Sequence, residues 1–230
     1  MRYTDWNPVY EAILRDFGYD RAGDERVRDR LAVLARRFDH DRLPPFAGAT
    51  VAVCGAAPSL ADDLALARRA DLVVAASTAA DVCRAEGVAV DLMVTDLDKN
   101  PETAVELTHE STPVAVHAHG DNRPLVEEYV PQTTSEWTLP TTQAEPVGPV
   151  ENLGGFTDGD RGAFLADHFG ADELLFPGWA FDDPEVSPEK RRKLAWAERL
   201  LYWLERRRGE RFAVLDGRRE DIDTSALPVE

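Results

Sequence analysis

The chain has 230 residues, with 43 Asp and Glu against 26 Lys and Arg, so its formal net charge is −17. Such an acidic surface argues against partners that are themselves negative, namely nucleic acid and anionic membranes. The length and the ordinary apolar content favour one globular α/β domain with a helical addition. Only three basic residues are lysines, and the excess of carboxylates indicates a halophile, whose salt-rich cytoplasm screens surface repulsion.

Signals for targeting or cross-linking are sparse in this sequence. No run approaches the roughly 18 apolar residues of a membrane span, and residues 1–5 lack the apolar core of a signal peptide. We therefore expect a cytoplasmic protein. The two cysteines, Cys54 and Cys83, support neither a disulfide framework nor a zinc site, so we expect them to fill the core.

Residues 1–45 predict an N-terminal helical hairpin. Aromatic and aliphatic residues recur at helical spacing through residues 1–18, where Gly18 ends the pattern. A second helix is expected at residues 23–38, before the chain is broken by Pro44 and Pro45. We expect this hairpin to cover one edge of the main domain.

Residues 46–217 form the predicted main domain, in which strand and helix patterns alternate. This alternation predicts a three-layer α/β/α fold with a mostly parallel sheet. Residues 133–149 favour one or two extended strands, such as 135–139, and 212–215 would add a last strand. An acidic tail, residues 218–230, is expected to fray after residue 221. The other strands are expected at 50–54, 72–76, 92–95, 113–117 and 173–176. The helices are expected at 60–69, 78–86, 101–109, 124–130 and 188–208, with one more that follows the glycine-rich loop and ends at about residue 169.

The strongest local signal is the end of the predicted strand at residues 92–95. Two carboxylates, Asp96 and Asp98, follow it at spacing i, i+2, and Lys99 comes next. Carboxylate oxygens suit Mg²⁺, which shares its remaining coordination positions with water and substrate phosphates. The structural alternative is an acidic turn that merely ends a strand.

Polar clusters also follow three other predicted strands, at Gly55 to Ser59, at Ser77-Thr78 and at residues 117–122. Ligands of open parallel sheets bind outside the carboxyl ends of the strands, so four clusters at these ends indicate a binding or catalytic rim. The first cluster is open to two interpretations. Ser59 could simply cap a helix, or the amides of its turn could hold phosphate.

The cluster at residues 117–122 has equally open roles. His117 and His119 share one face of an extended segment, so they could hold a metal, carry protons or contact phosphate, or they could be structural. Asp121 is a natural turn residue beside Gly120. If the two strands are neighbours, it would add a third carboxylate near the pair at 96 and 98.

The glycine-rich loop at residues 154–161 is the second strong signal. Asp158 and Asp160 repeat the i, i+2 spacing, and Arg161 offers a fork that can bind phosphate. The paired glycines allow the backbone to approach a ligand closely. Carboxylates and an arginine at a helix start fit a metal–nucleotide better than a bare metal.

Three motifs together resemble a known family. They are Thr-Asp-Leu-Asp at 95–98, His-Ala-His-Gly-Asp-Asn at 117–122 and Gly-Phe-Thr-Asp-Gly-Asp-Arg at 155–161. This set resembles the archaeal 6-hydroxymethyl-7,8-dihydropterin diphosphokinases, whose core is similar to thiamine diphosphokinase, and the resemblance covers about residues 50–205. It implies Mg²⁺-dependent transfer of a diphosphoryl group from ATP to the hydroxymethyl group of a reduced pterin, with release of AMP, in pterin biosynthesis of the tetrahydromethanopterin or folate type.

The resemblance and the rim together suggest roles for individual residues. Ala57 stands where the family tends to have the second glycine of Gly-x-Gly-Pro-Ser-Leu. The expected catalytic residues are Asp96, Asp98 and His119. The expected metal ligands are Asp96, Asp98 and Asp121. The residues expected to bind nucleotide or phosphate are Gly55, Ser59, Ser77, Thr78, Lys99, Asn122, Thr157, Asp158, Asp160 and Arg161.

Phosphoryl-type transfer needs positioning and charge neutralisation, so the chemistry requires no nucleophilic side chain. A carboxylate of the Asp96–Asp98 pair, or His119, could accept the proton of the substrate hydroxyl. A thiamine diphosphokinase or another diphosphotransferase would use the same scaffold, and a non-catalytic nucleotide- or metal-binding module is the alternative of a different class. The expected partners are small molecules, and the sequence is compatible with a homo-oligomer.

Overall fold

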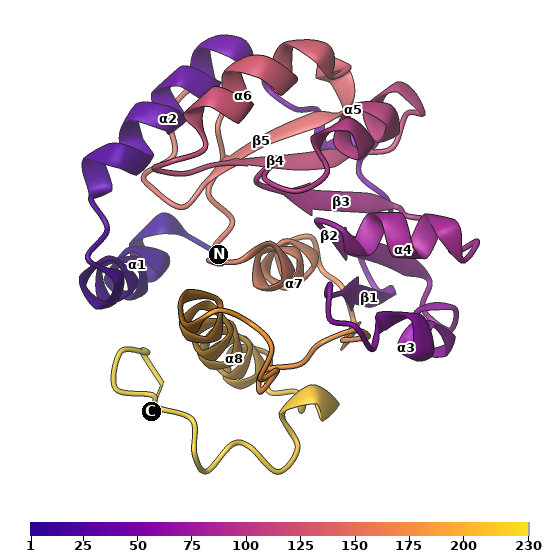
Figure 1. Cartoon of the computed structure of the whole chain (residues 1–230), viewed down its shortest axis with the longest axis vertical. Coiled ribbons are helices and arrows are strands. Elements are labelled where there is room, and N and C mark those ends of the chain that lie inside the picture. The colour runs from indigo at the N-terminus through magenta and orange to yellow at the C-terminus, as the bar shows by residue number, and fades with distance from the viewer. Residues whose placement is uncertain (230) are drawn as a thin grey trace.

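A computed structural model describes residues 1–229 and shows a single six-stranded sheet (Figure 1). The strand order is β5-β4-β3-β2-β1-β6, and every neighbouring pair is parallel. This confirms the predicted α/β fold with a parallel sheet. The strands are β1 (Thr50–Cys54), β2 (Leu72–Ala76), β3 (Leu92–Thr95), β4 (Val114–Ala118), β5 (Thr138–Thr142) and β6 (Glu173–Leu175).

Helices cover both faces of this sheet, because successive strand residues point to opposite sides and most are apolar. In β1, Val51 and Val53 join one buried cluster while Ala52 and Cys54 join the other. The helices packed on the second cluster are α2 (Arg21–Leu34), α3 (Leu60–Ala67), α4 (Ala79–Ala85), α5 (Pro101–His109) and α6 (Arg123–Tyr129). Those packed on the first are α1 (Tyr3–Phe17), α7 (Asp158–His168) and α8 (Pro188–Arg208).

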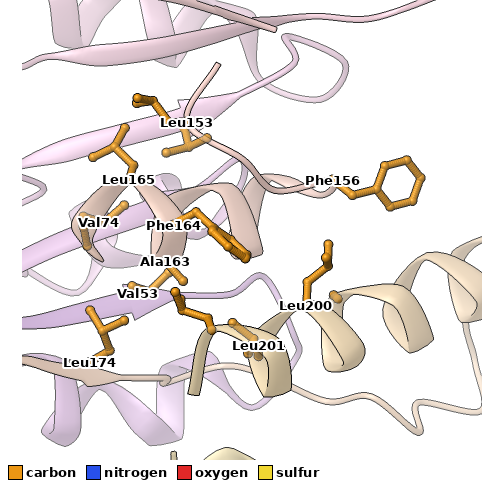
Figure 2. Packing of buried hydrophobic residues seen from close by; sticks show 14 of the residues in the cluster. Val53, Val74, Leu153, Phe156, Ala163, Phe164, Leu165, Leu174, Leu200 and Leu201 are labelled. Carbon is orange, nitrogen blue, oxygen red and sulfur yellow. The ribbon is translucent and has the colours of Figure 1, made fainter. Parts of the chain in front are cut away.

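Helix α7 lies directly on the sheet because it carries a glycine at the contact. A Cβ added at Gly162 would come 3.0 Å from Cγ1 of Val74 and 3.2 Å from Cγ1 of Val53. On the outer side of α7, Phe164 faces α8 (Figure 2). Its ring lies 6.4 Å from Trp6 of α1 and 5.7 Å from Trp203 of α8. An aromatic cluster therefore joins the three helices of this layer.

The order of the strands creates one reversal. From β1 to β5 the chain moves steadily toward one edge, with the connecting helices on one face. It then returns through α7 on the opposite face to β6, which pairs with β1. The point between β1 and β6 is therefore the topological switch of this sheet, the place where open α/β sheets commonly bind ligands.

Both N-terminal helices are present, and they separate onto different layers. Helix α2 contacts β4 and the edge strand β5, as expected of an element that covers an edge. Helix α1 instead packs with α7 and α8 through Trp6. The longest helix, α8, is rich in charged residues, and within residues 1–229 no helix has the length and apolarity needed to cross a membrane.

Two expected strand positions are wrong. Residues Ser135–Trp137 form a 3₁₀ helix, and the strand begins only at Thr138. This strand lies at the edge of the sheet. Proline has no N–H, and Pro140 is tolerated there because an edge strand has a neighbouring strand on one side alone. Residues Ala213–Leu215 are also a 3₁₀ helix. The N–H of the preceding Phe212 donates to the carboxylate of Glu205 instead of to a neighbouring strand.

The C-terminal tail is packed where fraying was expected. Leu227 is buried in the core cluster, and Ile222 and Val229 pack against the same cluster. Arg219 anchors the start of this segment through a 2.7 Å ion pair with the buried Glu205. The acidic composition hid these apolar contacts, because the few apolar residues of the tail are all used for docking.

The acidic composition leads to a prediction about salt. Exposed carboxylates repel one another at low ionic strength, and the screening length falls from about 10 Å at 0.1 M salt to about 3 Å at 1 M. With a net charge of −17, the chain should therefore melt at a markedly higher temperature in molar KCl than in 0.1 M KCl. Thermal unfolding followed by circular dichroism over this range measures the effect, and a flat melting temperature would contradict the halophile interpretation.

Candidate active site

The turn after β3 holds Asp96 and Asp98 in a strained conformation. Leu97 between them has φ +69°, which bulky residues rarely adopt, and its side chain is fully buried. The Leu97 N–H donates to Thr95 Oγ1 at 2.9 Å, and the Asp98 N–H donates to Asp96 Oδ1 at 3.1 Å. The buried leucine thus anchors a tight turn that keeps both carboxylates at the carboxyl end of β3.

The loop after β4 places His119 against this turn. Its Nε2 lies 3.3 Å from Asp96 Oδ2, and its Nδ1 lies 2.9 Å from Asp121 Oδ1. Burial would lower the pKa of His119, but the hydrogen bonds with Asp121 and Asp96 raise it to about 9. Asn122 ties the two loops together, because its Nδ2 donates to the carbonyl oxygens of Asp96 and His117 at 2.8 and 2.7 Å. His119 is therefore a fixed cation between two carboxylates.

His117, the other member of the predicted histidine pair, has a different environment. It is 1% exposed, and its Nδ1 lies 3.1 Å from Thr141 Oγ1. Burial, and then the charge of Arg161, lower its pKa well below the usual value, so the ring is neutral. His117 belongs to the support of the site, while His119 faces the carboxylates.

The start of α7 brings a third carboxylate to the rim. Asp158 forms a 3.0 Å ion pair with Arg161 Nη1. Burial, and then the charge of Asp96, raise the pKa of Asp158 to about 8. Burial and the neighbouring Asp96 also raise the pKa of Asp98. Burial acts in the same direction on Asp96, but the hydrogen bonds with His119 and Asp98 outweigh it and lower the pKa of Asp96. Three acids therefore share one local field, which is a setting that favours a bound cation.

Asp160 and Thr157 shape this loop. Thr157 Oγ1 donates to Asp160 Oδ2 at 2.6 Å, and the N–H groups of Thr157 and Phe156 also donate to the Asp160 carboxylate. This reciprocal cap starts α7 and leaves Asp160 fully buried. Arg161 is 6% exposed, with Nη2 hydrogen-bonded to Gln143 Oε1 and to the Phe156 carbonyl. The second pair of aspartates is thus split, with one at the rim and one inside the loop.

The three expected metal ligands do not meet at one point. The Asp121 side chain is 89% exposed, and the ring of His119 lies between it and Asp96. Within residues 1–229 no three His, Cys, Asp or Glu side chains are placed to hold a metal ion together. The Asp96–Asp98 pair does fit Mg²⁺, which is often held by one or two carboxylates together with substrate phosphates.

The first turn of the rim is committed to packing. A Cβ added at Gly55 would come 2.5 Å from the carbonyl oxygen of Gly178, so glycine is required by the loop after β6. The N–H groups of Gly55 and Ala57 donate to the carbonyls of Pro177 and Gly178. Ser59 is exposed, and its hydroxyl donates to Asp63 Oδ2 at 3.1 Å. The Ser59 end of the predicted phosphate-binding turn thus faces solvent, whereas the N–H groups of Gly55 and Ala57 are bound by the loop after β6.

The other predicted ligand-binding residues lie between these loops. Ser77, after β2, has φ +49°, and its buried hydroxyl has no partner among residues 1–229. Strain and an unpartnered hydroxyl at a strand end mark a position that a ligand can use. Thr78 caps α4 without a side-chain hydrogen bond. Lys99 is exposed and lies 3.4 Å from Asp98 Oδ2.

The structure adds two residues that the sequence interpretation missed. Asp24 of α2 is buried and accepts hydrogen bonds from the N–H of Gly120, from Tyr10 Oη and from Gln143 Nε2 at 2.6, 2.6 and 2.7 Å. Gln143 links this carboxylate to Arg161. One signal was present, because Asp24 stands at i−3 from the buried Val27 and so on the apolar stripe of its helix.

The fold and the rim define a ligand-binding α/β protein with an acidic site at the carboxyl ends of β3 and β4. A sequence model described as "6-hydroxymethylpterin diphosphokinase MptE-like" matches residues 29–185, and the chain belongs to this family. It is 37% identical to the 6-hydroxymethyl-7,8-dihydropterin pyrophosphokinase of Methanothermobacter thermautotrophicus over 90% of this chain and 96% of the relative. It is similar to proteins of the same name from Pyrococcus furiosus, with 35% identity over 89% and 94%, and from Methanocaldococcus jannaschii, with 29% over 89% and 96%.

Proposed function

We propose that the protein transfers the diphosphoryl group of ATP to the hydroxymethyl oxygen of 6-hydroxymethyl-7,8-dihydropterin and releases AMP. The observation that carries this proposal is the Asp96–Asp98 pair at the end of β3, with His119 Nε2 3.3 Å from Asp96 Oδ2, in a chain that belongs to the pterin diphosphokinase family. The names of the three relatives support the same acceptor. We place the reaction in the cytoplasm, where ATP is supplied.

Asp96 and Asp98 would hold Mg²⁺, which would neutralise charge on the ATP phosphates. His119 adds a positive charge beside this pair. Asp158 and Arg161 pair with each other at the start of α7, and the charges of both interact with that of Asp96. In this arrangement the protein contributes charge and position, which are the main requirements of phosphoryl-type transfer.

The contacts of His119 and Asp98 favour one of the two candidates for the proton acceptor. Both ring nitrogens of His119 face carboxylates, so both carry protons and neither offers a lone pair to the substrate. Asp98 is half-exposed at the rim, and within residues 1–229 the one basic group paired with its carboxylate is the exposed Lys99, at 3.4 Å. We assign Asp98 as the acceptor of the hydroxyl proton and Asp96 as the residue that orients His119.

The test is a turnover assay with two acceptors. The protein is incubated with ATP, Mg²⁺ and either 6-hydroxymethyl-7,8-dihydropterin or thiamine, and AMP and the diphosphorylated product are separated by chromatography. We expect AMP and pterin diphosphate in equal amounts with the pterin, and neither product with thiamine. Product with thiamine alone would reassign the acceptor. No AMP with either acceptor would favour a non-catalytic binding module.

A further inference from the structure

A hollow lies at the topological switch of the sheet, and neither Asp96, Asp98 nor Asp158 lines it. Its volume is about 500 Å³, within the range of about 300–1,000 Å³ that small-molecule pockets occupy. It opens between the turn after β1 and the loop after β6. Its walls include Pro58, Ser59, Trp179, Phe181, Asp183 and Arg218.

The aromatic wall of this cavity is held in place from several sides. Trp179 Nε1 donates to the carbonyl of Val53 at 2.8 Å, and its indole lies against Gly55. Trp179 and Phe181 have ring centroids 5.8 Å apart and are tilted by 56°. The Arg218 guanidinium lies 5.3 Å from the Phe181 ring and pairs with the carboxylate of Asp182. The wall is therefore formed before any ligand arrives.

We propose that this cavity binds the adenosine part of ATP, an inference that rests on the proposed diphosphokinase function. Aromatic and proline side chains offer flat apolar surfaces for a base, because every base has a π-face that stacks on such groups. Adenosine also presents hydrogen-bond donors, namely its exocyclic amine and the ribose hydroxyls. Asp183 lines the cavity, and its carboxylate, which accepts one hydrogen bond from the Glu185 N–H through Oδ1, has further acceptor capacity for such donors.

The position of the cavity selects the nucleoside over the pterin. The aspartate pair follows β3, and the cavity begins at β1, which is two inter-strand spacings away, or roughly 10 Å. In ATP, the ribose and the α-phosphate separate the base from the β-phosphorus that is attacked. In the pterin, a single carbon separates the ring from the attacking oxygen. A pterin in this cavity would hold its hydroxyl too far from the phosphorus at Asp98.

A direct contact connects the cavity wall with the aspartate cluster. A Cβ added at Gly159 would come 2.8 Å from Cζ2 and Cη2 of Trp179, so the indole edge touches the first turn of α7. The neighbouring residue in that turn is Asp158, which is paired with Arg161 at 3.0 Å and is close enough to Asp96 for the two charges to interact. The nucleotide would thus run along the rim from the indole toward the carboxylates, with its base at the switch point.

A cavity-filling variant tests this inference without turnover. Ala180 lines the cavity and is partly exposed, so Ala180→Leu adds volume there without entering the core. Binding of ADP and of inorganic pyrophosphate, each with Mg²⁺, is measured by isothermal titration calorimetry. We expect ADP affinity to fall tenfold or more while pyrophosphate affinity is unchanged. Ala85→Leu, the same substitution at the exposed end of α4, is the matched control and should leave both affinities as they are.

Val214→Phe fills the cavity from its other side and guards against a folding defect in the first variant. If both variants bind ADP as tightly as the control, the inference is overturned. It is also overturned if they raise the KM for the pterin while ADP binding is unchanged, since the cavity would then hold the acceptor. Because the titrations need no pterin, a failure of the diphosphokinase assay would be recognised separately from a failure of the nucleoside site.

Discussion

Replacing Asp98 by asparagine should lower turnover by about 10²-fold or more, which corresponds to about 2.7 kcal/mol of activation barrier. Asparagine keeps the shape of the side chain and removes the charge and the proton acceptor. The fold should survive, because the side chain is 43% exposed and the turn is anchored by Leu97. The measurement is the rate of AMP release at saturating ATP, pterin and Mg²⁺, together with the melting temperature.

The matched control is Asp172→Asn. Asp172 is exposed and directly precedes β6, so it lies at the amino edge of the sheet, opposite the rim. Asp172→Asn and Asp98→Asn change the net charge of the protein by the same amount. The comparison therefore separates a local effect at the site from a change in the electrostatic field of the whole protein. Equal AMP release by the two variants would remove Asp98 from the centre of the proposed site.

The fold was largely readable from the sequence because each strand is a short apolar run bounded by turn residues. The runs at 50–54, 72–76 and 92–95 are buried on both faces, which is what a parallel sheet with helices on either side requires. The errors arose where this logic weakens. Residues 135–137 directly precede an edge strand that contains Pro140, and Phe212 and Leu215 are apolar because they pack into the core outside the sheet.

The site was only partly readable, because strand ends specify which loops meet and not how their side chains divide the space. The strand-end rule placed Asp96 and His119 together correctly. It could not show that the imidazole would separate Asp121 from the other carboxylates. Likewise the repeated aspartate spacing at 158 and 160 predicted two ligands, whereas a helix start turns one of them inward as a cap.

The N-terminal helices were expected to act as a cover, and the structure connects them to the chemistry. The buried carboxylate of Asp24, in α2, accepts hydrogen bonds from the hydroxyl of Tyr10, in α1, and from the N–H of Gly120. Gly120 stands between His119 and Asp121, so the geometry of the imidazole depends on a contact 96 residues distant in sequence. No local pattern in residues 117–122 could reveal this partner.

Asp24→Asn should therefore reduce both stability and turnover. The carboxylate accepts three hydrogen bonds, and an amide in its place must direct N–H groups toward the donor of Gly120 or toward those of Tyr10 and Gln143. A buried donor left without an acceptor costs about 1–3 kcal/mol, so we expect a loss of that size in the free energy of unfolding. Turnover at saturating substrates should fall about tenfold or more, because the loop that carries His119 is no longer held.

The control for this prediction must lose stability without touching the loop. Leu31→Ala, on the same helix and fully buried, should cost about 2–5 kcal/mol and leave the Gly120 contact intact. Both variants are assayed well below their melting temperatures, so that the folded fraction is nearly complete in each. If Asp24 positions the loop, Asp24→Asn loses turnover while Leu31→Ala retains it per folded molecule. Parallel losses in the two variants would show that Asp24 contributes to stability alone.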